Sequence, residues 1–168
     1  MEIKGMTIKR LSEALSGQQK VLEELLDLLK QETSELTDVN IEAMTEINSK
    51  KEELGSRIQT HTAVLRQVIA ETMNSLGLPS DLPFGELAAK LGQQGNKEII
   101  LQHEQLNAVA EQVRQVAAMN QEIAGRFADA LNQSLNFLTR IINQSSVYGA
   151  SGGYQQRTPG AVIINMEA

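Results

Sequence analysis

The chain contains two histidines, His61 and His103, and no cysteine, so the histidines are the first candidates for metal binding. A metal site needs several ligands that converge on one point. Both histidines fall at apolar positions of two different predicted helices, so they could meet inside a helical bundle. Polar residues at such positions commonly set the register of helix pairing instead. We therefore favour a structural role for both, and the sequence predicts no metal ion and no cofactor.

Adjacent carboxylates and one lysine are the next candidates for chemistry. Glu23-Glu24 and Glu52-Glu53 are neighbours in sequence, and adjacent residues on a helix point about 100° apart rather than toward a common substrate. We expect all four on solvated faces. Lys51 falls among apolar positions, where its stem can be buried while its amine reaches the solvent. A structural role is favoured over a catalytic one.

Three glycines, Gly149, Gly152 and Gly153, lie close together near the carboxyl end. A phosphate-binding loop needs either a following Lys and Ser or Thr, or a preceding strand and a following helix. Here the glycines follow a helical stretch and lead into a polar tail. No serine nucleophile motif occurs either. The sequence therefore predicts that the protein is not an enzyme.

The composition restricts the class of protein further. Aromatic residues make up 3% of the 168-residue chain, so the core must be thin and built from aliphatic side chains and Met, which is typical of helical bundles. The net charge of −6 comes from mixed acidic and basic residues without a basic stripe, which disfavours binding to nucleic acid or to a membrane surface. No long apolar stretch indicates a signal peptide or a membrane span, so we expect no membrane insertion and a cytoplasmic location.

Three long stretches without proline carry apolar residues at helical spacing and must position the residues discussed above. They predict helices at about residues 7–36, 40–76 and 97–146. A glycine and two prolines end the second stretch, and a short helical turn is expected at about residues 84–91 in the connector that follows.

A helix with one apolar stripe must cover that stripe, so the first two helices are expected to form an antiparallel hairpin against which the third packs. The predicted fold class is therefore all-α: three long helices in an antiparallel bundle or coiled coil at residues 1–146, with a flexible tail at residues 147–168. The third helix is the longest, and an apolar overhang would need a partner. Its predicted seam consists of Ile99, Leu106, Ala110, Val113, Ala117, Ala124, Phe127, Leu131, Leu138 and Ile142.

The seams of the first two helices follow an alternating spacing of four and three residues. The first seam consists of Leu11, Leu15, Leu22, Leu25, Leu29 and Leu36, with Gln18 and Glu32 at polar positions of the same grid. The second consists of Met44, Ile47, Leu54, Ile58, Leu65, Val68 and Leu76, with Lys51, His61 and Thr72 among them. The stretch at residues 37–40 is rich in side chains that can cap a helix and predicts the turn between the two helices.

Two stretches of the chain resemble the FlgN family of flagellar export chaperones. Residues 47–58, INSKKEELGSRI, have Lys51 and Leu54 where the family's second helix has a Lys and a Leu. Residues 132–153, NQSLNFLTRIINQSSVYGASGG, are similar to the family's last helix followed by its Tyr-Gly-Ala-x-Gly stretch. Two features depart from the family's pattern: Ser151 stands where an acidic residue is frequent, and the connector is long.

The resemblance implies a chaperone of flagellar type III export. Members of the family bind the hook-filament junction proteins FlgK and FlgL in the cytoplasm, keep them from premature assembly and deliver them to the export gate. It also implies that client binding lies mainly on the carboxyl-terminal helix. The candidate client-binding residues lie beside its seam: Val116, Met119, Ile123, Leu135 and Ile141. A second interpretation is that such residues widen the apolar stripe because two other helices of the bundle press on it.

The tail carries two further candidates. The resemblance implies that Tyr148 and Gly149 help to dock the loaded chaperone on the export gate. Alternatively, Tyr148 packs back against the last helical turn as part of a C-terminal cap. Residues 161–164 form a short apolar cluster rich in β-branched side chains. This cluster either adds a strand to a partner's sheet or packs loosely.

Two other functions remain open at this point. A self-associating structural coiled-coil protein would use the same surplus seam to form a homo-oligomer without a secreted client. A histidine-based metal or redox enzyme would contain bound metal.

Overall fold

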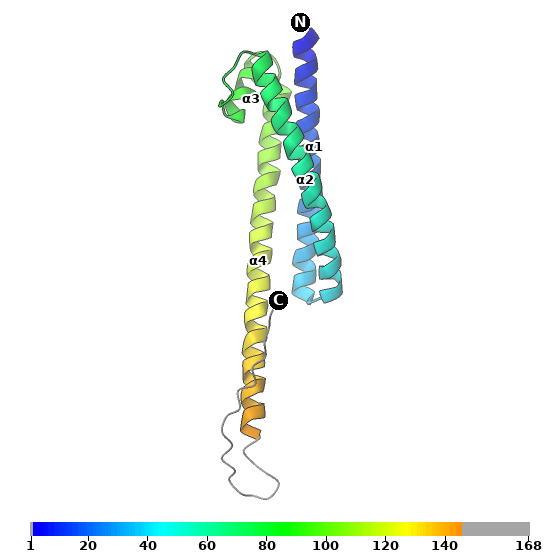
Figure 1. The fold of residues 1–168 in the computed structure, drawn as a ribbon, viewed down its shortest axis with the longest axis vertical. Helices are drawn as coiled ribbons and strands as arrows, with labels where there is room; N and C mark the ends of the chain where they lie inside the picture. Colours follow the sequence, from blue (N-terminus) through cyan, green and yellow to red (C-terminus); the bar gives the residue numbers. More distant parts are fainter. Residues whose placement is uncertain (1, 146–168) are drawn as a thin grey trace, which may run out of the picture. The chain divides into compact units, whose positions relative to one another are not determined.

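The computed structural model describes the backbone of residues 2–145 and the side chains of residues 5–141. Over residues 2–145 it contains no strand, and the predicted all-α fold class is confirmed. The predicted tail lies outside the described residues. The helices are α1 (Glu2–Asp38), α2 (Ile41–Ser75), α3 (Phe84–Gln93) and α4 (Lys97–Ser145) (Figure 1).

The chain divides into two compact units, Met1–Ala124 and Gly125–Ala168. The first unit contains α1, α2, α3 and residues 97–124 of α4, and these elements form an all-α bundle. The described part of the second unit is helical, at residues 125–145.

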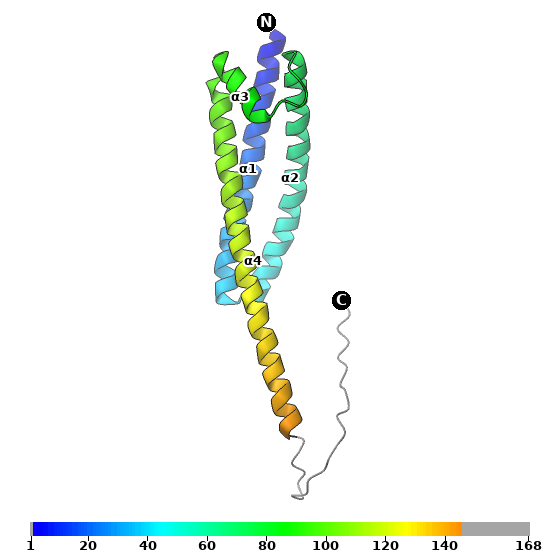
Figure 2. The same cartoon turned by 90° about the vertical axis from the view of Figure 1, so that its left-hand side faces the viewer.

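α1 and α2 form an antiparallel hairpin with a very short turn (Figure 2). Val39 adopts a positive φ of 56° and ends α1, where the Asn40 N–H donates to the Glu35 carbonyl at 3.0 Å. Asn40 then caps α2, because its side-chain oxygen accepts the Ala43 N–H at 3.2 Å. The turn expected within residues 37–40 is thereby confirmed, with Asn40 as the capping residue.

The connector between α2 and α4 contains α3 and is bounded by two glycines. Gly77 and Gly95 have φ values of +67° and +100°, a region that glycine enters without steric cost. Each follows a helix whose last turn closes in a Schellman pattern, with Leu78 N–H donating to the Met73 carbonyl and Asn96 N–H to that of Leu91, both at 3.0 Å. These turns bring α3 across the end of the bundle.

Two apolar clusters hold the first unit together. One joins all four helices at the α3 end and consists of Leu11, Leu15, Val68, Met73, Leu87, Ala88, Leu91 and Ile99. The other joins α1 to α2 through Val21, Leu28, Ile47 and Leu54. Val21 and Leu28 are absent from the predicted seam, because that seam assumed a single covered face. α1 instead has two long neighbours, α2 through this cluster and α4 through hydrogen bonds such as Asn120 Nδ2 to the Leu29 carbonyl.

Candidate functional site

The two histidines lie in different surroundings, and the suggestion that they meet in the bundle is wrong. His61 packs on α1, where a Cβ at Gly17 would come within 3.0 Å of its Nδ1, so Gly17 permits this close approach. His103 makes an edge-to-face contact with Phe84 of α3, with ring centroids 5.1 Å apart, and its Nε2 is 3.0 Å from Asn107 Nδ2. Among the described side chains, no group of three His, Asp or Glu residues could hold a metal ion.

The predicted solvated carboxylates include one pair between helices. Glu24 of α1 accepts two hydrogen bonds from Arg57 of α2, at 2.6 and 3.1 Å. The hydrogen bond from the guanidinium lowers the pKa of the Glu24 carboxyl and raises the pKa of Arg57. Glu23, Glu52 and Glu53 are exposed. The carboxylates therefore include no convergent acid–base pair, and Glu24 joins the two helices of the hairpin.

A buried polar cluster joins α1, α2 and α4 within the first unit. Glu32 is 6% exposed; its Oε1 pairs with the Lys51 ammonium and its Oε2 accepts a hydrogen bond from Asn120 Nδ2 at 2.9 Å. Asn120, 4% exposed, also donates to the Leu29 carbonyl at 2.8 Å and accepts from Thr33 Oγ1 at 2.6 Å. We call Glu32, Thr33, Lys51 and Asn120 the polar cluster.

The polar cluster corrects the expectation for the direction of the Lys51 side chain. The amine was expected to reach the solvent, but it turns inward to Glu32 because a buried carboxylate needs a compensating charge. A hollow of about 210 Å³ beside the cluster is lined by residues of the same three helices, among them Leu36, Met44 and Ala117. Both oxygens of the buried Glu32 are occupied, one by Lys51 and one by Asn120, so the polar cluster joins the three helices to one another.

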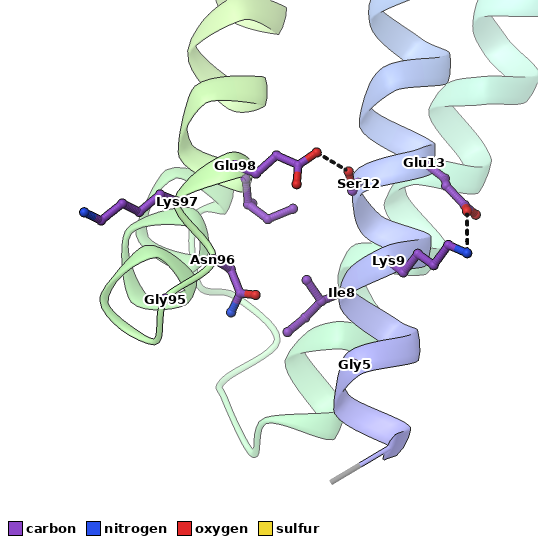
Figure 3. Close-up of a pocket in the computed structure, with 10 residues that line it drawn as sticks. Gly5, Ile8, Lys9, Ser12, Glu13, Gly95, Asn96, Lys97 and Glu98 are labelled. Carbon is purple, nitrogen blue, oxygen red and sulfur yellow. Dashed lines mark hydrogen bonds and ion pairs between the residues drawn. The ribbon is translucent and has the colours of Figure 1, made fainter.

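A second hollow, of about 540 Å³, lies between the first turns of α1 and the start of α4 (Figure 3). Ile8 and Asn96 face each other across it, while Lys9 and Glu13 turn toward each other on the other side of α1. Ser12 donates to Glu98 Oε1 at 3.3 Å. Lys97 points away from the hollow, and the polar side chains of Ser12, Asn96 and Glu98 do not converge on a common point with it.

The candidate client-binding residues differ in exposure. Val116 and Ile123 are half-buried in the first unit, where Met119 is exposed. Leu135 and Ile141, in the second unit, are both exposed. Their role in binding stays a prediction.

The predicted seam of α4 changes its character along the helix. Ile99 is buried, and Leu106, Ala110, Val113 and Ala117 are half-buried. Every residue from 124 to 141 is exposed, including the predicted seam residues Phe127, Leu131 and Leu138. Phe137, which the sequence reasoning did not select, is exposed as well; an aromatic residue in a chain so poor in aromatics was the available signal. We call Phe127, Leu131, Leu135, Phe137, Leu138 and Ile141 the exposed apolar face.

Residues 125–141 also carry few charges. Arg126, Asp129 and Arg140 are the charged residues of this segment, whereas amides and hydroxyls make up most of its other polar residues. Within residues 2–145, none of the helices combines the length and the apolar character that a membrane span requires. Tyr148, Gly149 and residues 161–164 lie outside the described residues.

Comparison with models of known protein families gives a match. The family model described as FlgN protein matches residues 1–156, which is most of the chain. No curated protein and no solved structure matches the chain.

Proposed function

The chain belongs to the FlgN family of flagellar export chaperones, and on that premise we propose that it binds hook-filament junction proteins of the FlgK or FlgL kind in the cytoplasm. It would keep these clients from premature assembly and deliver them to the export gate. The family is one of chaperones, so binding and release, not catalysis, are the expected activities.

One observation carries this proposal: the exposed apolar face on residues 125–141. Six large apolar side chains on a single helix are costly to leave in water, and such a face is typical of a surface for a helical partner. Leu135 and Ile141 belong to it, and Met119 is a flexible apolar side chain that can adapt to a partner. We propose that these three residues bind the client, together with Val116 and Ile123, which are half-buried and lie on the same helix.

The test is a direct binding measurement. The purified chain is mixed with a purified hook-filament junction protein, and the mass of the complex is measured by light scattering. A complex with a defined stoichiometry supports the chaperone function. A stable homo-oligomer of the chain that ignores the junction protein contradicts it.

The exposed apolar face also favours a second candidate, self-association as a structural coiled coil. The same light-scattering measurement on the chain alone separates the two functions. A monomer at micromolar concentration excludes the structural coiled coil, whereas a dimer or trimer that forms through residues 125–141 supports it.

We further propose that Tyr148 and Gly149 dock the loaded chaperone on the export gate. The support is the family resemblance of the Tyr-Gly-Ala-x-Gly stretch, which lies within the matched residues. Secretion of the client, measured beside binding of the client, tests this part of the proposal separately.

A further inference from the structure

The exposed apolar face is wider than the narrow seam of a two-stranded coiled coil. Leu135 and Phe137 are 59% and 64% exposed and lie two residues apart. At about 100° per residue they are separated by about 200° in one direction around the helix axis, and by about 160° in the other. Phe127, Leu131 and Leu138 project within the arc of about 160° between them. The face therefore spans close to half of the helix circumference.

Polar and charged residues complete the opposite side of the same helix. Asn136 lies between Leu135 and Phe137 in sequence and so points away from both. Arg126, Asp129 and Arg140 also project outside the apolar arc. In a two-stranded coiled coil the apolar seam is narrow and charged residues commonly flank it. Here Leu135 and Phe137 form the two edges of the face, and the nearest charged residue, Arg126, projects about 20° beyond Phe137.

The first unit shows how the width of an apolar stripe relates to the helices that pack on it. On α1, Leu26 and Leu28 are also two residues apart, and both are buried, at 6% exposure each. α1 has two long helical neighbours, α2 and α4. On α2, Ile47 and Leu54 form a single buried row where the second cluster joins this helix to α1. At the α3 end, where α3 and α4 pack as well, α2 buries both Val68 and Met73, which point about 140° apart. In the first unit, both flanks of a helix's apolar stripe are therefore buried where more than one helix packs on it.

We propose that the exposed apolar face binds two helical segments of the client at once, one on the Leu135 side and one on the Phe137 side. This rests on the proposed chaperone function and specifies the partner: a pair of amphipathic helices with apolar stripes and few charges at the contact. The three helices together would bury the face as α1 is buried in the first unit. Because no charged side chain projects from the face, binding is expected to change less than about threefold when the salt concentration is raised tenfold.

Crosslinking at three consecutive positions tests the proposal. A photoreactive phenylalanine analogue replaces Leu135, Asn136 or Phe137 in the full chain, and each variant is irradiated with a full-length hook-filament junction protein. Positions 135 and 137 are expected to crosslink to two different helical segments of that protein, identified by mass spectrometry. Position 136, on the opposite side, is the matched control and should crosslink several-fold less.

Each other outcome has a definite meaning. Crosslinks from positions 135 and 137 to the same client segment would overturn the two-helix proposal and leave the chaperone function intact. Crosslinks to a second copy of this chain would assign the face to self-association and overturn it as well. If light scattering detects no complex with the junction protein, the proposed function itself fails.

Substitutions provide a second measurement that does not depend on crosslinking. Leu135→Gln and Phe137→Gln each remove one flank, and the single changes should each weaken client binding about tenfold or more. Since the two flanks contact separate helices, the effects should multiply in the double variant. A double variant no weaker than either single variant would contradict the proposal. Gln keeps good helix propensity, so circular dichroism of the variants should match that of the unchanged chain.

Discussion

Asn120 of α4 donates a side-chain N–H to Glu32 Oε2 of α1 at 2.9 Å, although the two residues are 88 positions apart in the chain. Lys51 of α2 neutralises the same carboxylate from its other oxygen. One buried anion is therefore shared by three helices of the first unit. Because an amide and an ammonium can satisfy it only when all three helices are in register, the polar cluster fixes their alignment.

Removing the cation from the polar cluster should destabilise the bundle strongly. Lys51→Met keeps the apolar stem but leaves Glu32 buried without a compensating charge, at an expected cost of about 2–3 kcal/mol in the free energy of unfolding. Lys50→Met is the matched control: Lys50 pairs with Glu46 at 2.6 Å on an exposed surface, so its loss should cost less than about 0.5 kcal/mol. Urea unfolding followed by circular dichroism measures both.

The double variant separates a charge effect from a packing effect. Glu32→Leu combined with Lys51→Met removes both charges, and replacing a buried pair by apolar residues commonly restores most of the stability. The double variant should therefore be more stable than Lys51→Met alone. If Lys51→Met and Lys50→Met cost the same, the inward pairing of Lys51 makes no contribution.

The members of the polar cluster were only partly predictable. Glu32 and Lys51 were placed on the seams of their helices, because spacing along one helix determines which positions face inward. Their pairing depends on how far one helix is shifted along the other, which spacing within a single helix does not contain. Asn120 had no distinguishing signal, since the third helix contains many amide side chains.

The exposed apolar face shows a second limit of the same reasoning. Periodicity correctly identified Phe127, Leu131 and Leu138 as members of one apolar row. It does not say whether the helix that covers a row belongs to the same chain. The half-buried Leu106 and the exposed Leu138 carry the same signal in the sequence and differ in their surroundings.

Relieving the backbone at the α1–α2 turn should stabilise the protein. Val39 holds a φ of 56°, a left-handed conformation that is unfavourable for a β-branched residue, and its side chain is 46% exposed. Val39→Gly removes that conflict and loses little buried area, so the free energy of unfolding should rise by about 1 kcal/mol after the entropy cost of glycine is included. Thermal and urea unfolding give the value.

Gly77, which follows α2, provides a control in which the free energy of unfolding should change in the opposite direction. Its φ is +67° and no atom lies within 4 Å of a Cβ built there, so Gly77→Ala tests backbone conformation without a steric clash. We expect a loss of about 1 kcal/mol. A Val39→Gly variant that is less stable than the unchanged chain would show that the left-handed conformation is not costly at that turn.

The ion pair between Glu24 and Arg57 should give a small pH dependence of stability. The Arg57 hydrogen bond lowers the pKa of the Glu24 carboxyl in the folded state. The stabilisation is therefore present above the ordinary Glu pKa of about 4.3 and is lost as the pH falls through the lower folded value. The difference in unfolding free energy between the unchanged chain and Arg57→Gln should shrink toward zero below that range. A difference that grows on acidification would contradict the pairing.

Substitutions in the middle of the exposed apolar face should separate binding from folding. Leu131 is exposed, so Leu131→Gln should change the free energy of unfolding by less than about 0.5 kcal/mol. The same change should weaken binding of a hook-filament junction protein by about tenfold or more, since central apolar anchors dominate interfaces. Asn136→Gln, on the opposite side of the helix, should leave the affinity unchanged. Equal losses for both variants would point to a general effect on the helix.

Tyr148→Ala tests the export-gate proposal separately from client binding. If Tyr148 contacts the gate, the variant should keep the affinity for the junction protein and the urea midpoint of the unchanged chain, while secretion of the client falls several-fold. If Tyr148 instead packs on the last helical turn as part of a cap, the variant should lose about 1 kcal/mol or less in the free energy of unfolding. Secretion should then fall only as far as this small loss of stability explains. Measuring affinity, stability and secretion on the same variant distinguishes the two, because a gate contact alters only the last. Full secretion by the Tyr148→Ala variant would remove Tyr148 from the docking surface.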